Sequence, residues 1–91
     1  MYSVTVTGRY KKDLKRIVSK TRPIEALDKV VFLLSNSDKS LPPEYKDHAL
    51  KGQYIGCREC HIKPDWLLVY KKDKDNLILI LIATGSHSSI F

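Results

Sequence analysis

The side chains in this chain best suited to chemistry are its three histidines, all in the C-terminal half: His48, His61 and His87. An imidazole titrates near neutral pH, so it can accept or donate a proton at a useful rate. Asp65 lies shortly after His61 and adds a carboxylate. Each histidine taken singly is more often structural, but all three fall beside predicted turns or strand ends, which points toward a shared functional site.

RNA cleavage is a reaction that these side chains can support. One group must deprotonate the 2′-hydroxyl, another must protonate the leaving 5′-oxygen, and cations or N–H donors must offset the charge of the phosphorane. Our candidate catalytic residues for the proton transfers are His48, His61, Asp65 and His87. His87 follows Thr84-Gly85-Ser86, a flexible exit from a strand where backbone N–H groups can face a phosphate.

Aromatic and basic side chains near these groups are candidates for binding the nucleotide. Trp66 and Phe91 can act as stacking platforms, because single-stranded RNA is usually held by aromatic faces. The alternative is that Trp66 packs in the core and that Phe91 docks the C-terminus. Arg58 can contact a phosphate or pair with Glu59. Strict strand alternation puts Arg58 and His61 on opposite faces of a sheet, so both serve one site only if a bulge intervenes.

Residues 57–61 also spell the pattern C-x-x-C-H, which is typical of covalent haem attachment. Cys57, Cys60 and His61 together are also a candidate zinc site. Haem attachment requires an oxidising compartment and an axial ligand, and Met1 is the only methionine. The two cysteines would moreover point to opposite faces of an alternating strand. We therefore expect no metal and no cofactor.

The positive charge of the chain is concentrated at its N-terminal end. The net charge is +6, from 16 basic and 10 acidic side chains. Residues 1–22 carry the whole excess, because Asp13 is the one acid there against Arg9, Lys11, Lys12, Lys15, Arg16, Lys20 and Arg22. A positive field confined to one segment suits nucleic acid or an acidic protein partner, and a solvated helix face gives the same pattern.

Length and composition place the chain among ordinary globular proteins. It has 91 residues, 43% of them hydrophobic and 29% charged, which suits one domain. No apolar run approaches the roughly 20 residues that span a bilayer. No basic region followed by an apolar stretch marks a signal peptide at the N-terminus. We expect a cytoplasmic protein without a membrane partner, with both cysteines reduced.

The elements that must position the histidines follow from hydrophobic periodicity. Residues 2–7 alternate as a half-buried strand with Val4 and Val6 on one side. The helix that follows should bury one face, made of Tyr10, Leu14, Ile17 and Val18. Pro23 suits the first turn of a second helix, which should end near residues 35–37.

The remainder of the chain predicts mostly strands. Prolines hold residues 41–45 extended, and strand-like runs follow at 53–55, 57–62, 66–70 and 77–84. Residues 77–82 are apolar on both faces, so they predict a central strand with helices on one side and other structure on the opposite side. The pattern is an α+β domain with two helices packed on one face of the sheet.

Three ordered stretches of this sequence resemble the YafQ-type branch of the RelE/ParE toxin superfamily. They are Leu41-Pro42-Pro43-Glu44-Tyr45-Lys46-Asp47-His48 through Gly52, Arg58-Glu59-Cys60-His61-Ile62-Lys63-Pro64-Asp65-Trp66 through Tyr70, and Thr84-Gly85-Ser86-His87-Ser88-Ser89-Ile90-Phe91. The first half matches only in its strand–helix–helix plan and basic character. The resemblance implies a RelE-like fold, β-α-α-β-β-β, with two N-terminal helices on a mostly antiparallel twisted sheet, in one domain over residues 1–91.

The resemblance also implies an activity and partners. It implies a bacterial type II toxin, a ribosome-dependent endoribonuclease that cuts mRNA without a metal through attack of the 2′-hydroxyl. The cognate antitoxin would silence it, and the toxin–antitoxin complex would bind operator DNA. Carried onto matching positions, His48, His61, Asp65 and His87 would be catalytic, with His87 as general acid. Trp66 and Phe91 would position the nucleotide, and the RNA-contacting cations of the basic helix would be Lys11, Lys12, Lys15 and Arg16.

One position departs from the family pattern. Many relatives carry an arginine just before the Thr-Gly-Ser/Thr-His run, where this chain has Ala83. Losing a group that offsets transition-state charge typically costs about 3 kcal/mol. Either another cation substitutes (Arg58, Lys51 or Lys63) or the nuclease is weak. Ala83 thus keeps open a second hypothesis, a non-catalytic module that binds antitoxin, DNA or ribosome through its basic helix.

Overall fold

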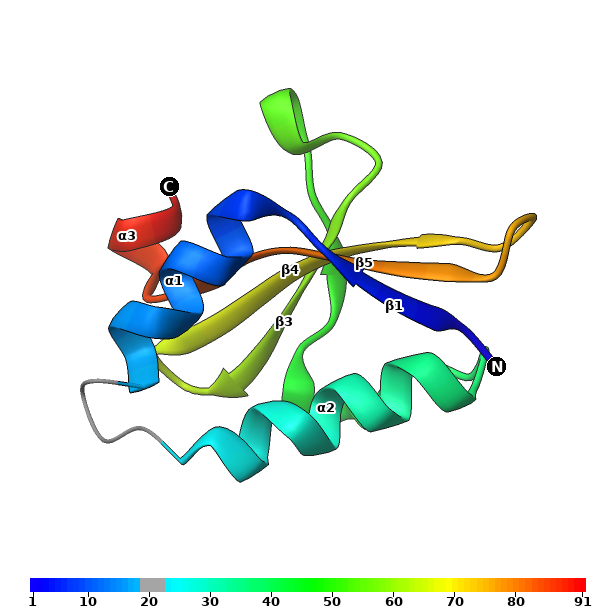
Figure 1. Ribbon diagram of the computed structural model, residues 1–91, viewed down its shortest axis with the longest axis horizontal. Coiled ribbons are helices and arrows are strands. Elements are labelled where there is room, and N and C mark those ends of the chain that lie inside the picture. The colour runs from blue at the N-terminus through cyan, green and yellow to red at the C-terminus, as the bar shows by residue number, and fades with distance from the viewer. Residues whose placement is uncertain (19–22) are drawn as a thin grey trace.

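The computed structural model describes residues 1–18 and 23–91 (Figure 1). Its helices and strands are β1 (Ser3–Val6), α1 (Gly8–Val18), α2 (Ile24–Asn36), β2 (His48–Ala49), β3 (Arg58–Lys63), β4 (Trp66–Asp73), β5 (Ile78–Gly85) and α3 (His87–Ile90). Two 3₁₀ turns, η1 (Pro43–Tyr45) and η2 (Gly52–Tyr54), flank β2. Lys20, Arg22 and the predicted helix break at residues 21–22 lie outside the described residues.

The strands form one twisted sheet in the order β1-β5-β4-β3-β2 (Figure 1). β1 pairs in parallel with β5, and the other neighbouring pairs are antiparallel. The predicted α+β fold with two N-terminal helices and a mostly antiparallel sheet is confirmed. The structure adds the short edge strand β2 and the terminal helix α3. The apolar strand β5 is interior, but β4 occupies the centre of the sheet.

Both N-terminal helices cover one face of the sheet and enclose the main core. From α2, Leu27, Val30 and Leu34 are buried there, as their spacing predicts. The helix ends at Asn36, inside the predicted boundary, and Pro23 precedes its first residue. None of the helices in the described part of the chain is long and apolar enough to cross a membrane.

The buried face of α1 is rotated from the predicted one. Tyr10 and Ile17 are buried as predicted, but Val18 is 58% exposed and Asp13 is buried in its place. The carboxylate of Asp13 accepts the backbone N–H of Thr84 at 3.2 Å, and this hydrogen bond turns an acidic position toward the sheet. Hydrophobic spacing alone therefore put Val18 on the buried face of α1, where the structure has Asp13.

A bulge in β5 divides its side chains between the two faces of the sheet. Tyr70 pairs with Leu81, whereas the preceding Val69 pairs with Ala83, so Ile82 is an extra residue. Leu81 therefore joins the core under the helices, and Ala83 joins a smaller cluster on the opposite face. We call that opposite face the second face; its cluster contains Leu67, Val69, Ala83 and Ile90.

Three local predictions were wrong. Residues 43–45 form η1 instead of an extended segment, because Pro43 at the first position suits a 3₁₀ turn. Residues 53–55 belong to η2 and its end instead of a strand, since Gly52 adopts a φ of +67° that starts the turn. Val4 is 47% exposed because β1 lies at the edge of the sheet.

Candidate active site

Strand pairing gathers two of the three histidines on the second face. His48 of β2 pairs with Glu59 of β3, which pairs with Val69 of β4. Directly paired residues share a face, so His48 and Glu59 lie on the same side as Val69. His61 lies two residues after Glu59 and therefore faces the same side, paired with Leu67.

His48 is held by hydrogen bonds at both ring nitrogens. Its Nε2 lies 2.9 Å from Oε2 of Glu59, and its Nδ1 lies 2.9 Å from the carbonyl oxygen of Lys46. A carbonyl only accepts, so Nδ1 carries a proton. When Glu59 is ionised, Nε2 must donate as well, and the imidazole then holds both protons and a positive charge.

Glu59 is the partner of His48 that sequence reasoning did not single out as a candidate. Its side chain is only 6% exposed, and its second oxygen, Oε1, has no hydrogen-bond partner among the described residues. Leaving a buried polar atom unpaired costs about 1–3 kcal/mol, so such atoms are rare unless a site needs them. The available signal was its place two residues before His61, on the same face of the strand.

The third histidine reaches the second face through α3. Gly85 pairs with Leu67, the residue that also pairs with His61, so the chain leaves β5 in the row of His61. A Cβ at Gly85 would lie 2.6 Å from Oγ of Ser89, and its φ is +153°, so only glycine fits this turn. Ser86 then caps α3 by accepting the backbone N–H of Ser89 at 3.2 Å.

Aromatic rings line the exposed side of α3. The ring centroid of His87 lies 5.1 Å from that of Phe91, and Phe91 meets Tyr54 of η2 edge to face at 5.3 Å. His87 and Phe91 are both exposed, whereas Ile90 is buried in the cluster beneath them. Phe91 is 47% exposed beside His87, so its role as a stacking platform stays a prediction.

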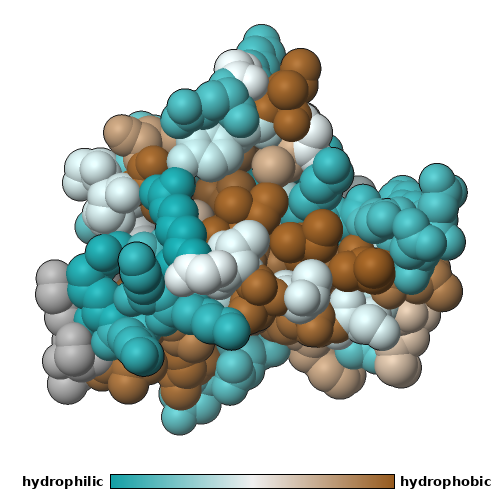
Figure 2. Space-filling view, turned by 45° about the horizontal axis from the view of Figure 1, so that its top comes forward, coloured by the Kyte–Doolittle hydropathy of each residue, from teal (hydrophilic) through white to brown (hydrophobic). Residues whose placement is uncertain are grey.

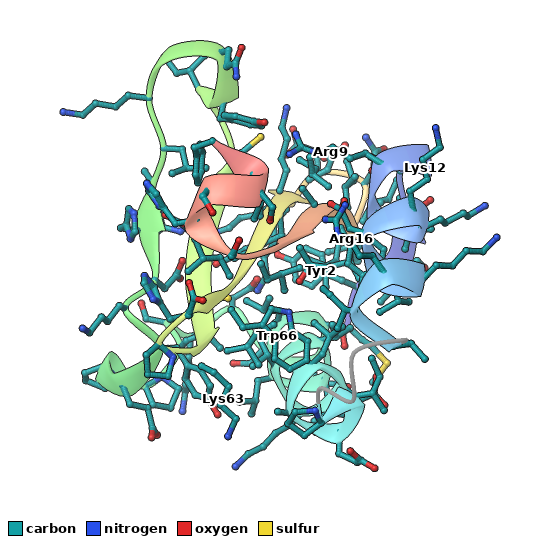
Figure 3. The ribbon with its side chains drawn as sticks, turned by 90° about the vertical axis from the view of Figure 1, so that its left-hand side faces the viewer. Tyr2, Arg9, Lys12, Arg16, Lys63 and Trp66 are labelled. Atoms are coloured by element: carbon teal, nitrogen blue, oxygen red, sulfur yellow. The ribbon has the colours of Figure 1, made fainter. Side chains whose placement is uncertain are left out.

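Two arginines of α1 lie next to the C-terminal segment, and Arg9 is hydrogen-bonded to it (Figure 3). Arg9 donates from Nη1 to the hydroxyl of Tyr54 at 2.6 Å and from Nη2 to the carbonyl of Ile90 at 3.1 Å. Arg16 donates to Asp13 at 3.0 Å, close to the backbone of Gly85. The basic helix therefore adjoins α3 directly. Neither Arg9 nor Asp13 was singled out as a site residue, because nothing local marks a partner so distant in the chain.

The proposed stacking role of Trp66 is wrong. Its side chain is 0% exposed and lies under the helices, where its Nε1 donates to Oγ1 of Thr84 at 2.9 Å. A ring without accessible surface cannot stack on a base. Trp66 instead packs in the core, which was the stated alternative, and it braces the end of β5.

Arg58 does not share a site with His61. Its Nε donates to Asp47 at 3.2 Å, and Asp47 also accepts the hydroxyl of Tyr70, which lies under the helices. Partial burial opposes the charge of Arg58, but Asp47 outweighs it and the pKa of the guanidinium is raised. The register shift in β3 lies between His61 and Lys63, so alternation holds from Arg58 to His61.

The remaining predicted residues are exposed and lie in three separate segments. Asp65 is exposed in the turn between β3 and β4. Lys51 is exposed at the start of η2, which projects from the sheet (Figure 1). The outer side of α1 presents Lys11, Lys12 and Lys15. From the side of η2, hydrophobic side chains gather at the centre of the surface between hydrophilic projections (Figure 2).

The two cysteines point to opposite faces of the sheet. Cys57 packs against the second-face cluster, and Cys60 is buried in the main core. Burial, with the charges of Asp47 and Glu59, raises the pKa of the Cys60 thiol to about 12. Within the described ranges, no group of three or more histidine, cysteine, aspartate or glutamate side chains is arranged to hold a metal ion.

Comparisons with known proteins agree with this architecture. A family model described as "Bacterial toxin of type II toxin-antitoxin system, YafQ" matches residues 2–91. The mRNA interferase toxin YafQ of Escherichia coli K12 is 37% identical over 89 residues, which are 97% of this chain and 94% of that protein.

Solved structures give the same result. The metal-bound toxin from Helicobacter pylori has a TM-score of 0.92 and 43% identity, with 100% of both chains covered. A chain of the DinJ–YafQ complex of E. coli has a TM-score of 0.90 and 32% identity, with 100% of this chain and 99% of that chain covered. This chain therefore belongs to the YafQ family of bacterial toxins of type II toxin–antitoxin systems.

Proposed function

We propose that this toxin is an mRNA interferase, an endoribonuclease that cleaves mRNA on the second face of its sheet. The observation that carries the proposal is the convergence of three distant segments. β2 and β3 bring His48 and His61 to one face, and the turn at Gly85 brings His87 to its margin. The E. coli K12 relative, which aligns over 94% of its length, is named an mRNA interferase toxin, and this supports the same activity here.

The hydrogen bonds of His48 assign it a charge-stabilising role in this proposal. Because both ring nitrogens face acceptors, His48 has no lone pair free to take a proton while Glu59 is ionised. A cation held by a buried carboxylate is suited to offset charge on the phosphorane. Glu59 is then a positioning residue, which holds the imidazolium without touching the substrate.

His61 and His87 are left for the proton transfers. His61 takes the proton of the 2′-hydroxyl, the 2′-oxygen attacks phosphorus, and the bond from phosphorus to the 5′-oxygen breaks. His87 donates a proton to that leaving oxygen. The products are a 2′,3′-cyclic phosphate and a 5′-hydroxyl, and no electrons are exchanged. Phe91, beside His87, stacks on a base of the message and orients the scissile bond. Asp65, exposed in the turn between β3 and β4, carries neither proton transfer in this scheme.

The absent arginine at position 83 has a partial structural replacement in this scheme. Ala83 lies in the same cross-strand row as Glu59 and His48, on the second face. Of the other cations considered, Arg58 lies on the wrong face. Lys51 and Lys63 flank the second face, but the imidazolium of His48 lies within the row itself.

The partners follow from the family and from the charge. A protein antitoxin is the partner of this family, and DinJ–YafQ complexes have been solved for the E. coli protein. The exposed lysines of α1 are our candidate contacts with ribosomal RNA, and the same basic surface suits an acidic antitoxin segment. The toxin–antitoxin complex would then bind its operator DNA.

The second candidate function is a non-catalytic binding module, and buried Ala83 is the observation that favours it. One experiment separates the two. The purified chain is added to ribosomes that translate one defined message, and the 5′ ends of the RNA are mapped. New 5′ ends that depend on His87 are expected. Absence of new ends with the unaltered chain would leave the binding module as the better account.

A further inference from the structure

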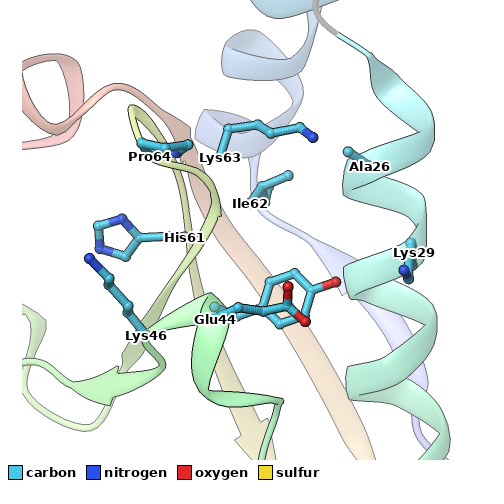
Figure 4. A pocket seen from close by; sticks show the side chains of 9 residues that line it. Ala26, Lys29, Glu44, Lys46, His61, Ile62, Lys63 and Pro64 are labelled. Atoms are coloured by element: carbon cyan, nitrogen blue, oxygen red, sulfur yellow. The ribbon is translucent and has the colours of Figure 1, made fainter.

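A polar hollow lies beside the histidines, at the edge of β3 (Figure 4). β2 pairs only with residues 58–59 of β3, so from His61 onward that edge of β3 has no neighbouring strand among the described residues. η1 closes one side of the gap, and α2 forms the other wall. The hollow has a volume of about 400 Å³, within the range of small-ligand sites.

Three lysines from three different segments line this hollow. They are Lys29 of α2, Lys46 after η1 and Lys63 at the end of β3, and all three are exposed at its margin. Glu44 is the one acidic side chain in its lining. The local charge is therefore positive, and we call this feature the lysine pocket.

The wall between the lysines is apolar. Ile62 is buried in the core cluster, Tyr45 is half-buried against the same cluster, and Pro64 completes the wall. An occupant with an anionic group and a flat, weakly polar group matches this lining. A nucleotide of single-stranded RNA has both, in its phosphate and its base.

The lysine pocket is continuous with the proposed catalytic face. His61 lies on the rim of the pocket beside Lys46 (Figure 4). The carbonyl of Lys46 accepts a hydrogen bond from Nδ1 of His48 at 2.9 Å, so one residue contacts both sites.

The backbone of Lys46 supports a functional role. It adopts φ 49° and ψ 41°, a left-handed conformation that glycine or asparagine would adopt at lower cost. Retaining lysine there keeps an ammonium group at the pocket, and the same conformation presents the carbonyl to His48. Strained residues of this kind concentrate at functional sites.

We propose that the lysine pocket binds the nucleotide next to the scissile phosphate on the same RNA strand. Lys29 and Lys63 neutralise its phosphate, Lys46 connects it to His48, and the apolar wall receives its base or sugar. The inference rests on the proposed RNA-cleaving function and adds a second subsite to it. With this second subsite the toxin should bind single-stranded RNA more tightly when the RNA is longer than a dinucleotide.

The test compares two uncleavable ligands, a dinucleotide and a tetranucleotide of single-stranded 2′-O-methyl RNA. The 2′-O-methyl group removes the attacking hydroxyl, so binding is measured without cleavage. The dinucleotide has one phosphate and fills only the histidine site, whereas the tetranucleotide also reaches the pocket. The test variant is the double change Lys29→Gln and Lys63→Gln, and the matched control is Lys71→Gln with Lys74→Gln in the β4–β5 hairpin. All four lysines are exposed, which preserves the fold.

The unaltered chain should bind the tetranucleotide more tightly than the dinucleotide. The Lys29/Lys63 variant should lose about tenfold of tetranucleotide affinity. Its plot of log affinity against log salt concentration should become shallower by about 0.7, because one neutralised phosphate of a single strand is lost. Its dinucleotide affinity, and all affinities of the control variant, should be unchanged. A Lys46→Gln variant should also weaken only the tetranucleotide.

Three results would overturn the inference: equal affinity of the unaltered chain for both ligands, unchanged tetranucleotide affinity in the Lys29/Lys63 variant, or an equal loss in the control. If that variant bound RNA normally but lost affinity for an antitoxin, the pocket would belong to a protein partner. Failure of the proposed function is a separate result, because it would show as the absence of message cleavage by the unaltered chain on ribosomes.

Discussion

Trp66 and Thr84 are joined by a buried hydrogen bond of 2.9 Å from the indole Nε1 to the hydroxyl Oγ1. The same hydroxyl donates to the carbonyl of Leu67 at 2.8 Å, and the backbone N–H of Thr84 donates to Asp13. Thr84 directly precedes the Gly85 turn that delivers His87 to the second face. The position of His87 is therefore fixed by a network on the opposite side of the sheet.

Replacing Trp66 with phenylalanine should destabilise the fold rather than remove a base contact. The change deletes the donor to Thr84 and part of a fully buried ring, so the free energy of unfolding should fall by about 1–3 kcal/mol. Urea unfolding measures this loss. The control is Phe91→Leu at an exposed ring, which should leave stability nearly unchanged and weaken RNA binding. Unchanged stability with weaker RNA binding in Trp66→Phe would contradict the core role.

Replacing Glu59 with glutamine should slow cleavage while the fold is retained. The amide has nearly the same volume, but it cannot hold an imidazolium with its charge. A hydrogen bond to a charged group contributes about 1.5–3 kcal/mol, so the single-turnover rate should fall roughly 10- to 100-fold. NMR of the His48 ring nitrogens should show a change in the hydrogen bond at Nε2.

An exposed acid provides the control for that change. Glu25→Gln on the outer surface of α2 should leave both the rate and the His48 signal as they are. If Glu59→Gln cleaved at the normal rate and left the His48 signal unaltered, Glu59 would be an ordinary buried residue.

Much of the fold was predictable because periodicity marks each amphipathic element. α2 is the clearest case, since Leu27, Val30 and Leu34 repeat at helical spacing between Pro23 and a cluster of turn formers. The extent of η1 and η2 was not predictable in this way. Short 3₁₀ turns bury few side chains and depend on single prolines or glycines, such as Gly52 at positive φ.

The candidate site was predictable in its histidines but not in what holds them. Strand alternation placed Arg58 and His61 on opposite faces, as the structure has them. The partnership of His48 with Glu59 depends on the register of β2, a two-residue strand with no pattern of its own. Arg9 reaches Ile90 across 81 positions, and nothing local in the sequence announces such a pairing.

The buried Cys60 thiol should make the free energy of unfolding fall at alkaline pH. Burial raises its pKa to about 12 from an unfolded value of 9.0. Below about pH 9 both states keep the proton, so this group leaves stability unchanged. Above that pH the unfolded chain releases a proton that the folded chain retains, and stability should fall with a slope of up to about 1.4 kcal/mol per pH unit.

Urea unfolding at a series of pH values from neutral to alkaline measures this slope. Cys60→Ala should flatten the first part of the decline, before the tyrosines titrate, and Cys57→Ala should not. Burial raises the pKa of Tyr10 to about 12 as well, but its unfolded value is 10.0, so its contribution begins at higher pH. Equal slopes in all three proteins would contradict the assignment.

Restoring an arginine at position 83 should increase cleavage and reduce stability. Ala83 is 0% exposed and packs with Ile90, so the larger side chain should cost about 1–3 kcal/mol of unfolding free energy. Ala83 shares its row with Glu59, whose Oε1 is unpaired, so a guanidinium extending along the row would meet this oxygen and the phosphate site.

The single-turnover rate of Ala83→Arg should rise by about 10- to 100-fold. Ala83→Leu is the matched control, because it imposes a similar packing cost without charge and should bring no gain. A folded Ala83→Arg protein that cleaves no faster than the unaltered chain would contradict this prediction, because it would show that His48 replaces the arginine completely and not in part.

The most direct test of the central claim is the single-turnover cleavage rate of one defined message on ribosomes, measured for His48→Ala, His61→Ala, His87→Ala and the three double variants. Residues that act in one site lose their effects non-additively. Each single change should lower the rate by at least about 100-fold, and each double change should cost little more than the worse of its singles. Normal rates in the single variants, or full multiplication of small effects in the doubles, would contradict a shared catalytic site on the second face.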